Sequence, residues 1–172
     1  MCQQMGGQTM NRNKAEHIIK GFSDVYNKMV SLNKFKMEAS LKEYTSSEVH
    51  CIEYIEENVD SNVTKLAESF YMTRGAISKI TKKLIKKGAI ESYQKTDNKK
   101  EIYFRLTKQG QETYKIHEGL HKEFQQRDKV VFDQVTEEQL DMMLSFMKKY
   151  SRHLDAEIKK QGLEIKDQSD FE

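Results

Sequence analysis

The sequence predicts a mainly α-helical fold with about six helices and one small β-hairpin. Three observations predict this class. The 172 residues contain no proline and only 8 glycines, so little interrupts helix propagation. Apolar residues recur at spacings of three and four over long stretches, which is the period of an amphipathic helix. Between residues 89 and 106 the pattern changes to that of short strands, which predicts the hairpin.

Local signals place the boundaries of the expected elements. Thr45-Ser46-Ser47-Glu48 and Thr136-Glu137-Glu138-Gln139 have the form of a capping box, which opens a helix. Thr73 and Thr107 stand at two further helix starts, and Gly88 ends the fourth helix. The expected elements are, in order, a helix over 14–41, a helix from Thr45, a turn over 58–62, a short helix holding Leu66, Ala67 and Phe70, a helix from Thr73 to Gly88, strands over 89–93 and 102–106, a helix over 107–131 and a helix from Thr136.

The composition excludes several classes of protein. Hydrophobic residues make up 37% of the chain and charged residues 33%, which is too polar for a membrane protein and too apolar for a disordered one. No apolar run approaches the roughly 20 residues that cross a bilayer, and the N-terminus lacks the pattern of a secretory signal. Cys2 and Cys51 are too few to staple a fold of this size, which fits a reducing compartment. We therefore expect a cytoplasmic protein with no membrane partner.

Positive charge is concentrated in one segment of the chain. Residues 64–110 hold twelve Lys and Arg against four Asp and Glu, a net charge of +8, whereas the whole chain carries +2. Such a block is typical of a surface that binds a polyanion, because neutralising phosphates supplies most of the nonspecific affinity for nucleic acid. Charge alone leaves a second interpretation open, namely a solvated lysine-rich helix face that binds nothing.

The order of the elements favours the first interpretation. Two helices, a short helix, a lysine-rich helix and a basic hairpin together describe a winged helix-turn-helix, whose recognition helix would begin at Thr73. The turn over 94–101 would form a basic wing tip. The expected core face of the recognition helix consists of Ile77, Ile80, Leu84 and Ile85. Its expected outer face consists of Lys79, Lys82, Lys83, Lys86 and Lys87.

Four strings in the sequence are distinctive. They are Thr64-Lys65-Leu66-Ala67, Thr73-Arg74-Gly75-Ala76-Ile77-Ser78-Lys79-Ile80, Leu84-Ile85-Lys86-Lys87-Gly88-Ala89-Ile90 and Phe104-Arg105-Leu106-Thr107-Lys108-Gln109-Gly110. Together they resemble the multiple-antibiotic-resistance (MarR) family of transcriptional regulators over about residues 15–154. The resemblance implies a sequence-specific DNA-binding regulator, expected to be a repressor, that binds a pseudo-palindromic operator as a homodimer.

The wing departs from the family pattern at one place. Many members carry Arg two residues after the wing Asp, whereas this chain has Asp97-Asn98-Lys99-Lys100. Lys is a point charge without the planar fork of Arg. The tip is therefore expected to contact phosphates.

The residues expected to bind double-stranded DNA come from three elements. Lys65 would position the helix that supports the recognition helix. Small polar residues at the start of the recognition helix would let its backbone approach base edges, and lysines would reach phosphates. The expected contacts on the recognition helix are Thr73, Arg74, Gly75, Ser78, Lys79 and Lys82. Those on the wing are Lys95, Asn98, Lys99 and Lys100.

The terminal helices are expected to form the dimer. They carry more apolar residues than one small winged domain can cover, and exposed stripes of that size usually mark an interface. The resemblance likewise implies that the first and last helices interlock with those of a second copy, while packing of the two helices within one chain is the alternative. The expected organisation is a disordered leader or expression remnant over 1–12, an N-terminal dimerisation helix over 13–44, a winged helix-turn-helix DNA-binding domain over 45–108, C-terminal dimerisation helices over 109–160 and a frayed acidic tail over 161–172.

Three histidines form a candidate effector pocket. His117 and His121 are four residues apart, so both project from one face of the expected fifth helix. The family resemblance implies that His50, on the second helix, packs near them. No carboxylate partner is evident for these histidines, although Glu38 or Glu43 could approach.

The resemblance also implies what could occupy this pocket. Repressors of fatty-acid synthesis in Gram-positive bacteria show a similar Glu-x-His and His-x-x-x-His pattern, matched here by Glu48, His50, His117 and His121, and their effector is an acylated carrier protein. Zinc-uptake repressors of the family use histidines at similar places. We expect a small-molecule or acylated-carrier effector, with a metal and purely structural histidines as alternatives. His17 and His153 are expected to be surface residues.

The sequence contains no catalytic motif. A phosphate-binding loop, a dinucleotide fingerprint, H-E-x-x-H and G-x-S-x-G are all absent. Acidic residues are expected on exposed helix faces beside lysines. His50 is not expected to activate the Cys51 thiolate, because neighbouring residues on a helix point in different directions. Cys51 is expected to be a small core residue. We therefore expect a protein that is not an enzyme and needs no cofactor. Two other classes stay open, namely a sensor module whose main role is to bind a metal or small ligand, and a winged-helix protein-interaction scaffold.

Overall fold

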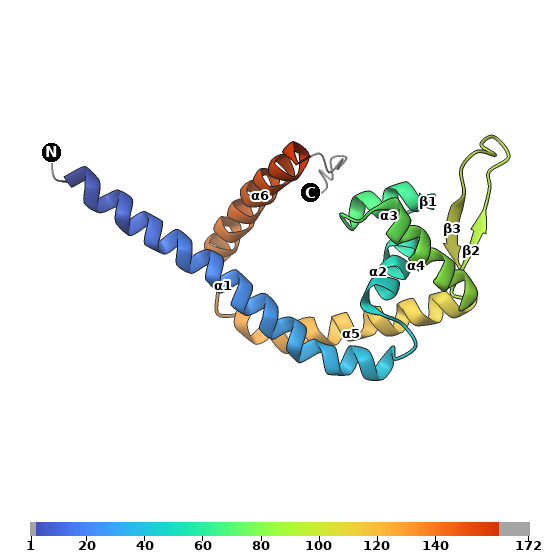
Figure 1. Cartoon of the computed structure of the whole chain (residues 1–172). Helices are drawn as coiled ribbons and strands as arrows, with labels where there is room; N and C mark the ends of the chain where they lie inside the picture. The colour runs from blue at the N-terminus through green and yellow to red at the C-terminus, as the bar shows by residue number, and fades with distance from the viewer. Residues whose placement is uncertain (1–2, 162–172) are drawn as a thin grey trace. The chain divides into compact units, whose positions relative to one another are not determined.

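The computed structural model describes residues 3–161, with side chains described from residue 13 onward. The chain forms two compact units, residues 1–42 and the residues from Glu43 onward. The first unit contains one long helix, and the second contains all the other elements (Figure 1). The frayed tail expected over 161–172 lies outside the described residues except for Gln161.

The described residues contain six helices and three short strands. They are α1 (Gln3–Ser40), α2 (Ser46–Glu57), β1 (Ser61–Asn62), α3 (Val63–Ser69), α4 (Arg74–Lys86), β2 (Ile90–Tyr93), β3 (Tyr103–Leu106), α5 (Lys108–Phe132) and α6 (Glu137–Lys160). The expected class and the expected order of helices and hairpin are therefore confirmed.

The first helix begins earlier than expected. Residues 3–12, expected to form a disordered leader, are helical as part of α1. Gln and Met are good helix formers and no proline interrupts the segment, so the helix continues through Gly6 and Gly7 despite their cost.

Side-chain caps set the helix starts of the second unit. At α2, Thr45 Oγ1 accepts a hydrogen bond from the Glu48 backbone N–H, and the Glu48 carboxylate accepts one from the Thr45 N–H at 2.8 Å. Thr136 forms the same reciprocal capping box at α6. Thr73 and Thr107 cap α4 and α5 through their hydroxyl oxygens. These four predictions are confirmed. In each cap the Thr hydroxyl oxygen accepts from the backbone N–H three residues later, a donor that would otherwise lack a partner.

The expected hairpin is part of a three-stranded antiparallel sheet with strand order β1-β3-β2. β1 is absent from the sequence-based prediction because two residues are too short to show a period. Its Ser61 lies opposite Phe104 and its Asn62 opposite Tyr103. The sheet thereby joins the hairpin to the turn between α2 and α3.

The core of the second unit lies between α2, α3, α4 and the sheet. Its buried members are Cys51, Ile52, Ile55, Leu66, Ala67, Ile77, Leu84, Ala89, Ile90, Phe104 and Leu106. Ile85, expected on the core face of α4, is 41% exposed, and Thr81 is buried instead. Ile85 follows Leu84 by one residue and therefore points about 100° further round the helix. Thr81 tolerates burial because its hydroxyl donates to the Ile77 carbonyl oxygen at 3.1 Å.

The start of α5 is fixed against the sheet by a close backbone approach. A Cβ atom at Gly110 would lie 2.0 Å from the carbonyl oxygen of Ala89. Only glycine allows this approach. From there α5 packs along α2, with His117, Leu120 and Phe124 buried.

Two helices present apolar stripes to solvent in the single chain. On α1 the exposed apolar residues include Ile18, Phe22, Val25, Met29, Leu32 and Phe35. On α6 they include Met142, Met143, Leu144, Phe146, Met147 and Leu154. No described residue of α6 is buried in the single chain.

Candidate nucleic-acid interface

The start of α4 is small, polar and accessible. Thr73 caps the helix, accepting from the Ala76 N–H at 3.2 Å, and Arg74 and Gly75 are exposed behind it. A Cβ atom at Gly75 would meet only the Thr73 hydroxyl, at 4.0 Å, so the fold does not require glycine here. The backbone at this position is therefore open to a partner that approaches closely.

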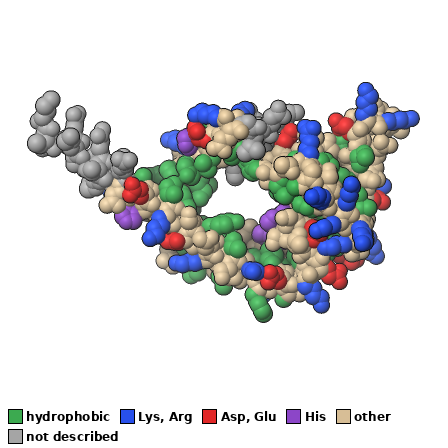
Figure 2. Space-filling view, viewed as in Figure 1, with side chains coloured by type: hydrophobic (Ala, Val, Ile, Leu, Met, Phe, Trp, Pro, Cys, Tyr) green, Lys and Arg blue, Asp and Glu red, His purple; other side chains and the backbone are tan. Residues whose placement is uncertain are grey.

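Lysines continue this surface along α4. Lys79 and Lys82, together with the neighbouring Lys83 and Lys86, are exposed. No ion pair to another described residue involves any of them, while Ser78 is half-buried beside them. Figure 2 shows Lys and Arg side chains gathered over this part of the second unit and at the wing tip. Unpaired, solvated cations in a row can bind the phosphate backbone of a duplex.

Lys87 does not belong to this outer face. Its ammonium donates to the Glu48 carboxylate at 2.8 Å and to the Glu43 carbonyl oxygen at 2.5 Å. It also lies over the ring of Tyr44, 4.9 Å from the centroid. The expectation that Lys87 faces outward is therefore wrong, because Lys87 is the C-cap of α4 and its side chain reaches the start of α2.

The carboxylate of Glu48 corrects a second expectation. Acidic residues were expected on exposed helix faces, but the side chain of Glu48 is only 2% exposed. Burial raises its pKa, and hydrogen bonds from Lys87 and from the Thr45 backbone outweigh that effect, so the pKa of Glu48 lies below its usual value. The ion pair thus holds α2 to the end of α4.

Lys65 lies at the first turn of the supporting helix. Its backbone N–H donates to the Asn62 side chain at 2.9 Å, which caps α3. Its ammonium is exposed and donates to the Val59 carbonyl oxygen at 3.4 Å.

The four expected wing residues fall into two groups. Lys99 and Lys100 are exposed at the tip with no side-chain partner among the described residues. Lys95 instead pairs with Asp60 at 2.5 Å, and the Asn98 amide donates to the Tyr103 hydroxyl at 3.3 Å. Two of the four side chains are therefore without a partner at the tip in the described part of the chain, and two already have one within the protein. DNA contact by any of the four stays a prediction.

The three predicted pocket histidines come together where α2 and α5 pack. The rings of His50 and His117 lie 5.9 Å apart between centroids, and those of His117 and His121 lie 4.3 Å apart. Nε2 of His117 and Nε2 of His121 are 3.0 Å apart, so one donates to the other. His117 is 1% exposed, whereas His50 and His121 are exposed.

A carboxylate, Glu53, belongs to the same cluster. One ligand atom each from His50, Glu53 and His117 lie within 4.8 Å of one another, close enough to hold a metal ion. The expectation that no carboxylate is evident here, apart from Glu38 or Glu43, is wrong. The signal was present, since Glu53 is three residues after His50 and therefore on the same helix face.

The buried nitrogen of this cluster lacks a partner. Nδ1 of His117 has no hydrogen bond, because the nearest Glu53 oxygen is 3.6 Å away, beyond hydrogen-bond distance. Burial, followed by the proximity of His121 and His50, lowers the pKa of His117 to about 4. Its ring is therefore neutral at pH 7, the form that binds a metal or accepts a hydrogen bond.

Cys51 lies in the core, as expected. It is 1% exposed, and burial, followed by the charge of Glu48, raises the pKa of its thiol to about 12. A thiol in this state is not a nucleophile at neutral pH. His17 and His153 are exposed, also as expected.

A helix-turn-helix with an exposed polar start, a row of unpaired lysines and a basic wing defines a DNA-binding protein of the winged-helix class. The family model described as "MarR family" matches residues 44–102. The chain is 30% identical to the HTH-type transcriptional regulator PchR of Bacillus subtilis over 148 residues, which are 78% of this chain and 88% of that protein. It is 36% identical to the uncharacterized HTH-type transcriptional regulator YhjH of the same organism over 129 residues, 74% of this chain and 70% of that protein. The chain therefore belongs to the MarR family of transcriptional regulators.

Solved structures agree with this fold. The structure of Streptococcus pneumoniae FabT in complex with DNA has a TM-score of 0.72, is 20% identical, and matches 83% of this chain and 98% of that chain. The Staphylococcus aureus MarR structure with salicylate and kanamycin has a TM-score of 0.68, is 16% identical, and matches 83% of this chain and 93% of that chain. Among the described residues, no helix is both long enough and apolar enough to cross a membrane.

Proposed function

We propose that the protein is a homodimeric repressor that binds a pseudo-palindromic operator, with α4 in the major groove and the wing tip along the backbone. The observation that carries this proposal is the exposed face of α4, whose cations have no ion-pair partner among the described residues. This face consists of Thr73, Arg74, Gly75, Lys79 and Lys82. Unpaired cations on this face contribute nothing to the stability of the fold, whereas they favour binding to phosphates. The proposal includes no catalytic activity, which agrees with relatives that are named as transcriptional regulators.

Base reading and phosphate binding belong to different residues in this proposal. Arg74 and Ser78, near the start of α4, would contact base edges, while Gly75 lets the backbone approach. Lysines would contact phosphates, which position the protein without reading sequence. The proposed phosphate contacts are Lys65, Lys79, Lys82, Lys99 and Lys100.

The apolar stripes of α1 and α6 support the dimer. They expose many large apolar side chains in the single chain, and a second copy is the partner that buries the same face on both chains under twofold symmetry. Two recognition helices would then lie about one turn of DNA, roughly 34 Å, apart.

A footprint on the DNA upstream of the gene that encodes this chain tests the proposal. Two protected half-sites with near-twofold symmetry, about one helical turn apart, are expected. Replacing Lys99 and Lys100 with Ala should weaken binding to all sequences alike, whereas Arg74→Ala or Ser78→Ala should change which sequence is preferred. The absence of any footprint at low salt would contradict the proposal.

A second proposal concerns regulation. We propose that His50, His117 and His121, together with Glu53, line an effector pocket between α2 and α5. The buried, unpaired Nδ1 of His117 favours it, because an orphan buried acceptor or donor costs free energy that a ligand can recover. The nature of the occupant, whether small organic molecule, acylated carrier or metal, is an outcome of the test.

Thermal unfolding separates these occupants. Wild type, His117→Ala and His121→Ala are each heated with zinc, with chelator and with neither. A zinc-dependent rise in the wild-type midpoint that either substitution abolishes supports a metal. No response of the wild type to zinc or chelator would contradict a metal as the occupant. A large loss of stability in the substituted proteins without any zinc response would show structural histidines and contradict the pocket.

A further inference from the structure

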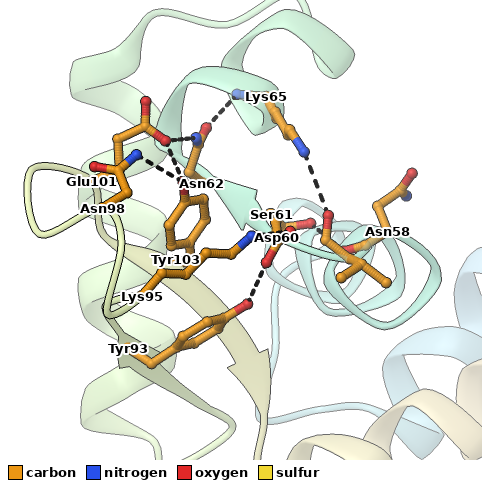
Figure 3. Close-up of polar contacts among 11 residues, drawn as sticks. Asn58, Asp60, Ser61, Asn62, Lys65, Tyr93, Lys95, Asn98, Glu101 and Tyr103 are labelled. Carbon is orange, nitrogen blue, oxygen red and sulfur yellow. Dashed lines mark hydrogen bonds and ion pairs between the residues drawn. The ribbon is translucent and has the colours of Figure 1, made fainter.

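The turn between α2 and α3 holds one arm of the wing through Asp60. This residue has a left-handed backbone (φ 59°), which Asp tolerates better than most residues. Its carboxylate accepts a hydrogen bond from the Tyr93 hydroxyl at 3.0 Å and another from the Lys95 ammonium at 2.5 Å (Figure 3). Tyr93 ends β2, and Lys95 lies at the start of the wing turn. Two side chains from one arm therefore converge on one carboxylate.

The positive charge of Lys95 is balanced within the protein by the negative charge of Asp60. Its ammonium also lies over the ring of Tyr103, 5.1 Å from the centroid. The hydrogen bond from Lys95 lowers the pKa of Asp60, and the same bond raises the pKa of Lys95. Both groups are therefore charged at neutral pH. The Lys95 cation thus already has an anionic partner, unlike Lys99 and Lys100.

The other arm of the wing is tied to the same turn. The Tyr103 hydroxyl donates to the Glu101 carboxylate at 2.7 Å, and the Asn62 amide donates to that carboxylate at 3.4 Å. Asn62 also pairs with Tyr103 in the sheet and caps α3 through the Lys65 N–H. Figure 3 shows both arms meeting the segment that leads into α3.

We infer that residues 60–62 form a clamp that sets the wing relative to the helix-turn-helix, with Asp60 as a positioning residue for DNA binding. The inference rests on the proposed DNA-binding function. Since α3 packs against α4, a wing fixed to the start of α3 is also fixed relative to the recognition helix. Lys99 and Lys100 are then presented in place before DNA arrives, which lowers the cost of ordering them on binding.

The clamp predicts that removing the charge of Asp60 lowers DNA affinity, whereas electrostatic attraction alone predicts that it raises DNA affinity. Removing the negative charge of Asp60 from a DNA-binding face should tighten binding if charge alone matters. If Asp60 positions the wing, Asp60→Asn should weaken binding about three- to tenfold, as expected for loss of one partly exposed ion pair with its hydrogen bonds. Asn tolerates the same left-handed backbone. The variant should therefore fold, with a far-UV circular dichroism spectrum like that of wild type.

The experiment titrates a fluorescein-labelled duplex of mixed sequence with the full-length protein at several salt concentrations. Lys99→Ala is expected to reduce the slope of log K against log salt by about 0.9 for each phosphate that the variant no longer neutralises. Lys95→Met is expected to weaken binding with no change in slope, because Lys95 pairs with Asp60 and not with phosphate. The double variant Asp60→Asn/Lys95→Met should be no weaker than either single variant, as for two residues that act through one interaction.

A matched control removes a charge from the same sheet without removing any contact to Asp60. Glu91 on β2 pairs with Arg105 on β3 at 2.7 Å, on the exposed face. Glu91→Gln is expected to leave DNA affinity unchanged or slightly higher. Amide hydrogen exchange over residues 94–101, measured without DNA, should be faster in Asp60→Asn than in wild type and unchanged in Glu91→Gln.

The outcomes separate the two claims. Tighter binding by Asp60→Asn, or a reduced salt slope for Lys95→Met, would overturn the clamp while leaving the proposed function intact. Unchanged exchange over 94–101 in Asp60→Asn would also overturn it. A wild-type protein that shows no salt-dependent DNA binding would instead contradict the proposed function itself.

Discussion

The ammonium of Lys87, just after the recognition helix, lies 2.8 Å from the buried carboxylate of Glu48 at the start of α2. The side chain of Glu48 is 2% exposed and that of Lys87 is 34% exposed. Glu48 also accepts the Thr45 N–H in the capping box of α2. One carboxylate therefore both starts α2 and holds the end of α4, which couples the recognition helix to the helix that lines the histidine cluster.

Loss of Lys87 should destabilise the fold. Lys87→Met leaves Glu48 buried without its cationic partner, which should cost about 2–3 kcal/mol of unfolding free energy. Urea denaturation at pH 7 measures this cost. Lys86→Met, which changes an exposed neighbour, is the control and should keep wild-type stability. Equal midpoints for the two variants would show that the ion pair contributes nothing.

The same ion pair gives a pH dependence with a defined sign. The pKa of Glu48 in the folded protein lies below its usual value, so the pair stabilises the fold above the unfolded pKa and the effect is lost as the pH falls through the folded value. In Lys87→Met, burial raises the pKa of Glu48 without an opposing cation. The stability gap between wild type and variant should therefore narrow as the pH falls below about 5. A gap that widens with acid would contradict this account.

Substitution of Gly75 should have opposite effects on the stability of the fold and on DNA affinity. The protein has room for a Cβ there, since the nearest atom is 4.0 Å away, and Ala has the higher helix propensity. Gly75→Ala should therefore raise the unfolding free energy by up to about 1 kcal/mol. If the α4 backbone approaches the bases at this point, the same variant should bind operator DNA at least tenfold more weakly. A variant that is stabilised and binds normally would remove Gly75 from the interface.

The exposed stripe of α6 predicts a dimer that persists without DNA. Leu144 is 56% exposed in the single chain. Leu144→Glu should weaken the dimer roughly 30-fold or more, because burying an unpaired carboxylate costs about 2 kcal/mol or more. Sedimentation equilibrium measures the change, with Glu138→Lys on the exposed start of α6 as the control.

Removal of α6 is the stronger form of this test. A chain that ends before Thr136 should lose the dimer and most of its folded state together, since an obligate interface is part of the core. A well-folded monomer after this truncation would count against the dimer architecture.

The lowered pKa of His117 predicts that the folded protein loses stability in mild acid. Its folded pKa of about 4 lies below the usual value of 6.5, so the folded state takes up a proton less readily than the unfolded state. Stability is then full above pH 6.5 and falls as the pH drops from 6.5 toward 4. Between pH 7 and pH 5 the loss should be about 2 kcal/mol.

The His117 effect can be measured in the presence of chelator, so that metal binding does not contribute. His50, His121 and Glu53 lie beside the same ring. His117→Gln is therefore compared with wild type, and it should lose most of the pH dependence between 7 and 5. An identical pH profile in the two proteins would contradict the assignment.

The sequence predicted the helices and the exposed lysine face of α4 because their signals are local. Thr45, Thr73, Thr107 and Thr136 mark helix starts through bonds that span three residues, and such bonds are visible as spacing. The exposed lysines of α4 follow from a single helical period. The dimer and the individual DNA contacts remain predictions.

Long-range pairings were not predictable in the same way. Asp60 and Lys95 are 35 residues apart, and Glu48 and Lys87 are 39 residues apart. No spacing rule connects residues on different elements, so Lys87 was placed on the outer face and the Asp60–Lys95 pair was not foreseen. The DNA contact expected of Lys95 stays a prediction. Only the packing of the turn before α3 against the wing, and of α2 against the end of α4, brings these charges together.

The salt dependence of DNA binding tests the central claim most directly. The measurement titrates the full-length wild-type protein onto an operator duplex from low to high salt and plots log K against log salt. With about 6–10 phosphates neutralised per dimer, the account predicts a straight line with a slope of about −5 to −9. A flat line would contradict the claim that the lysines of α4 and the wing tip bind the phosphate backbone.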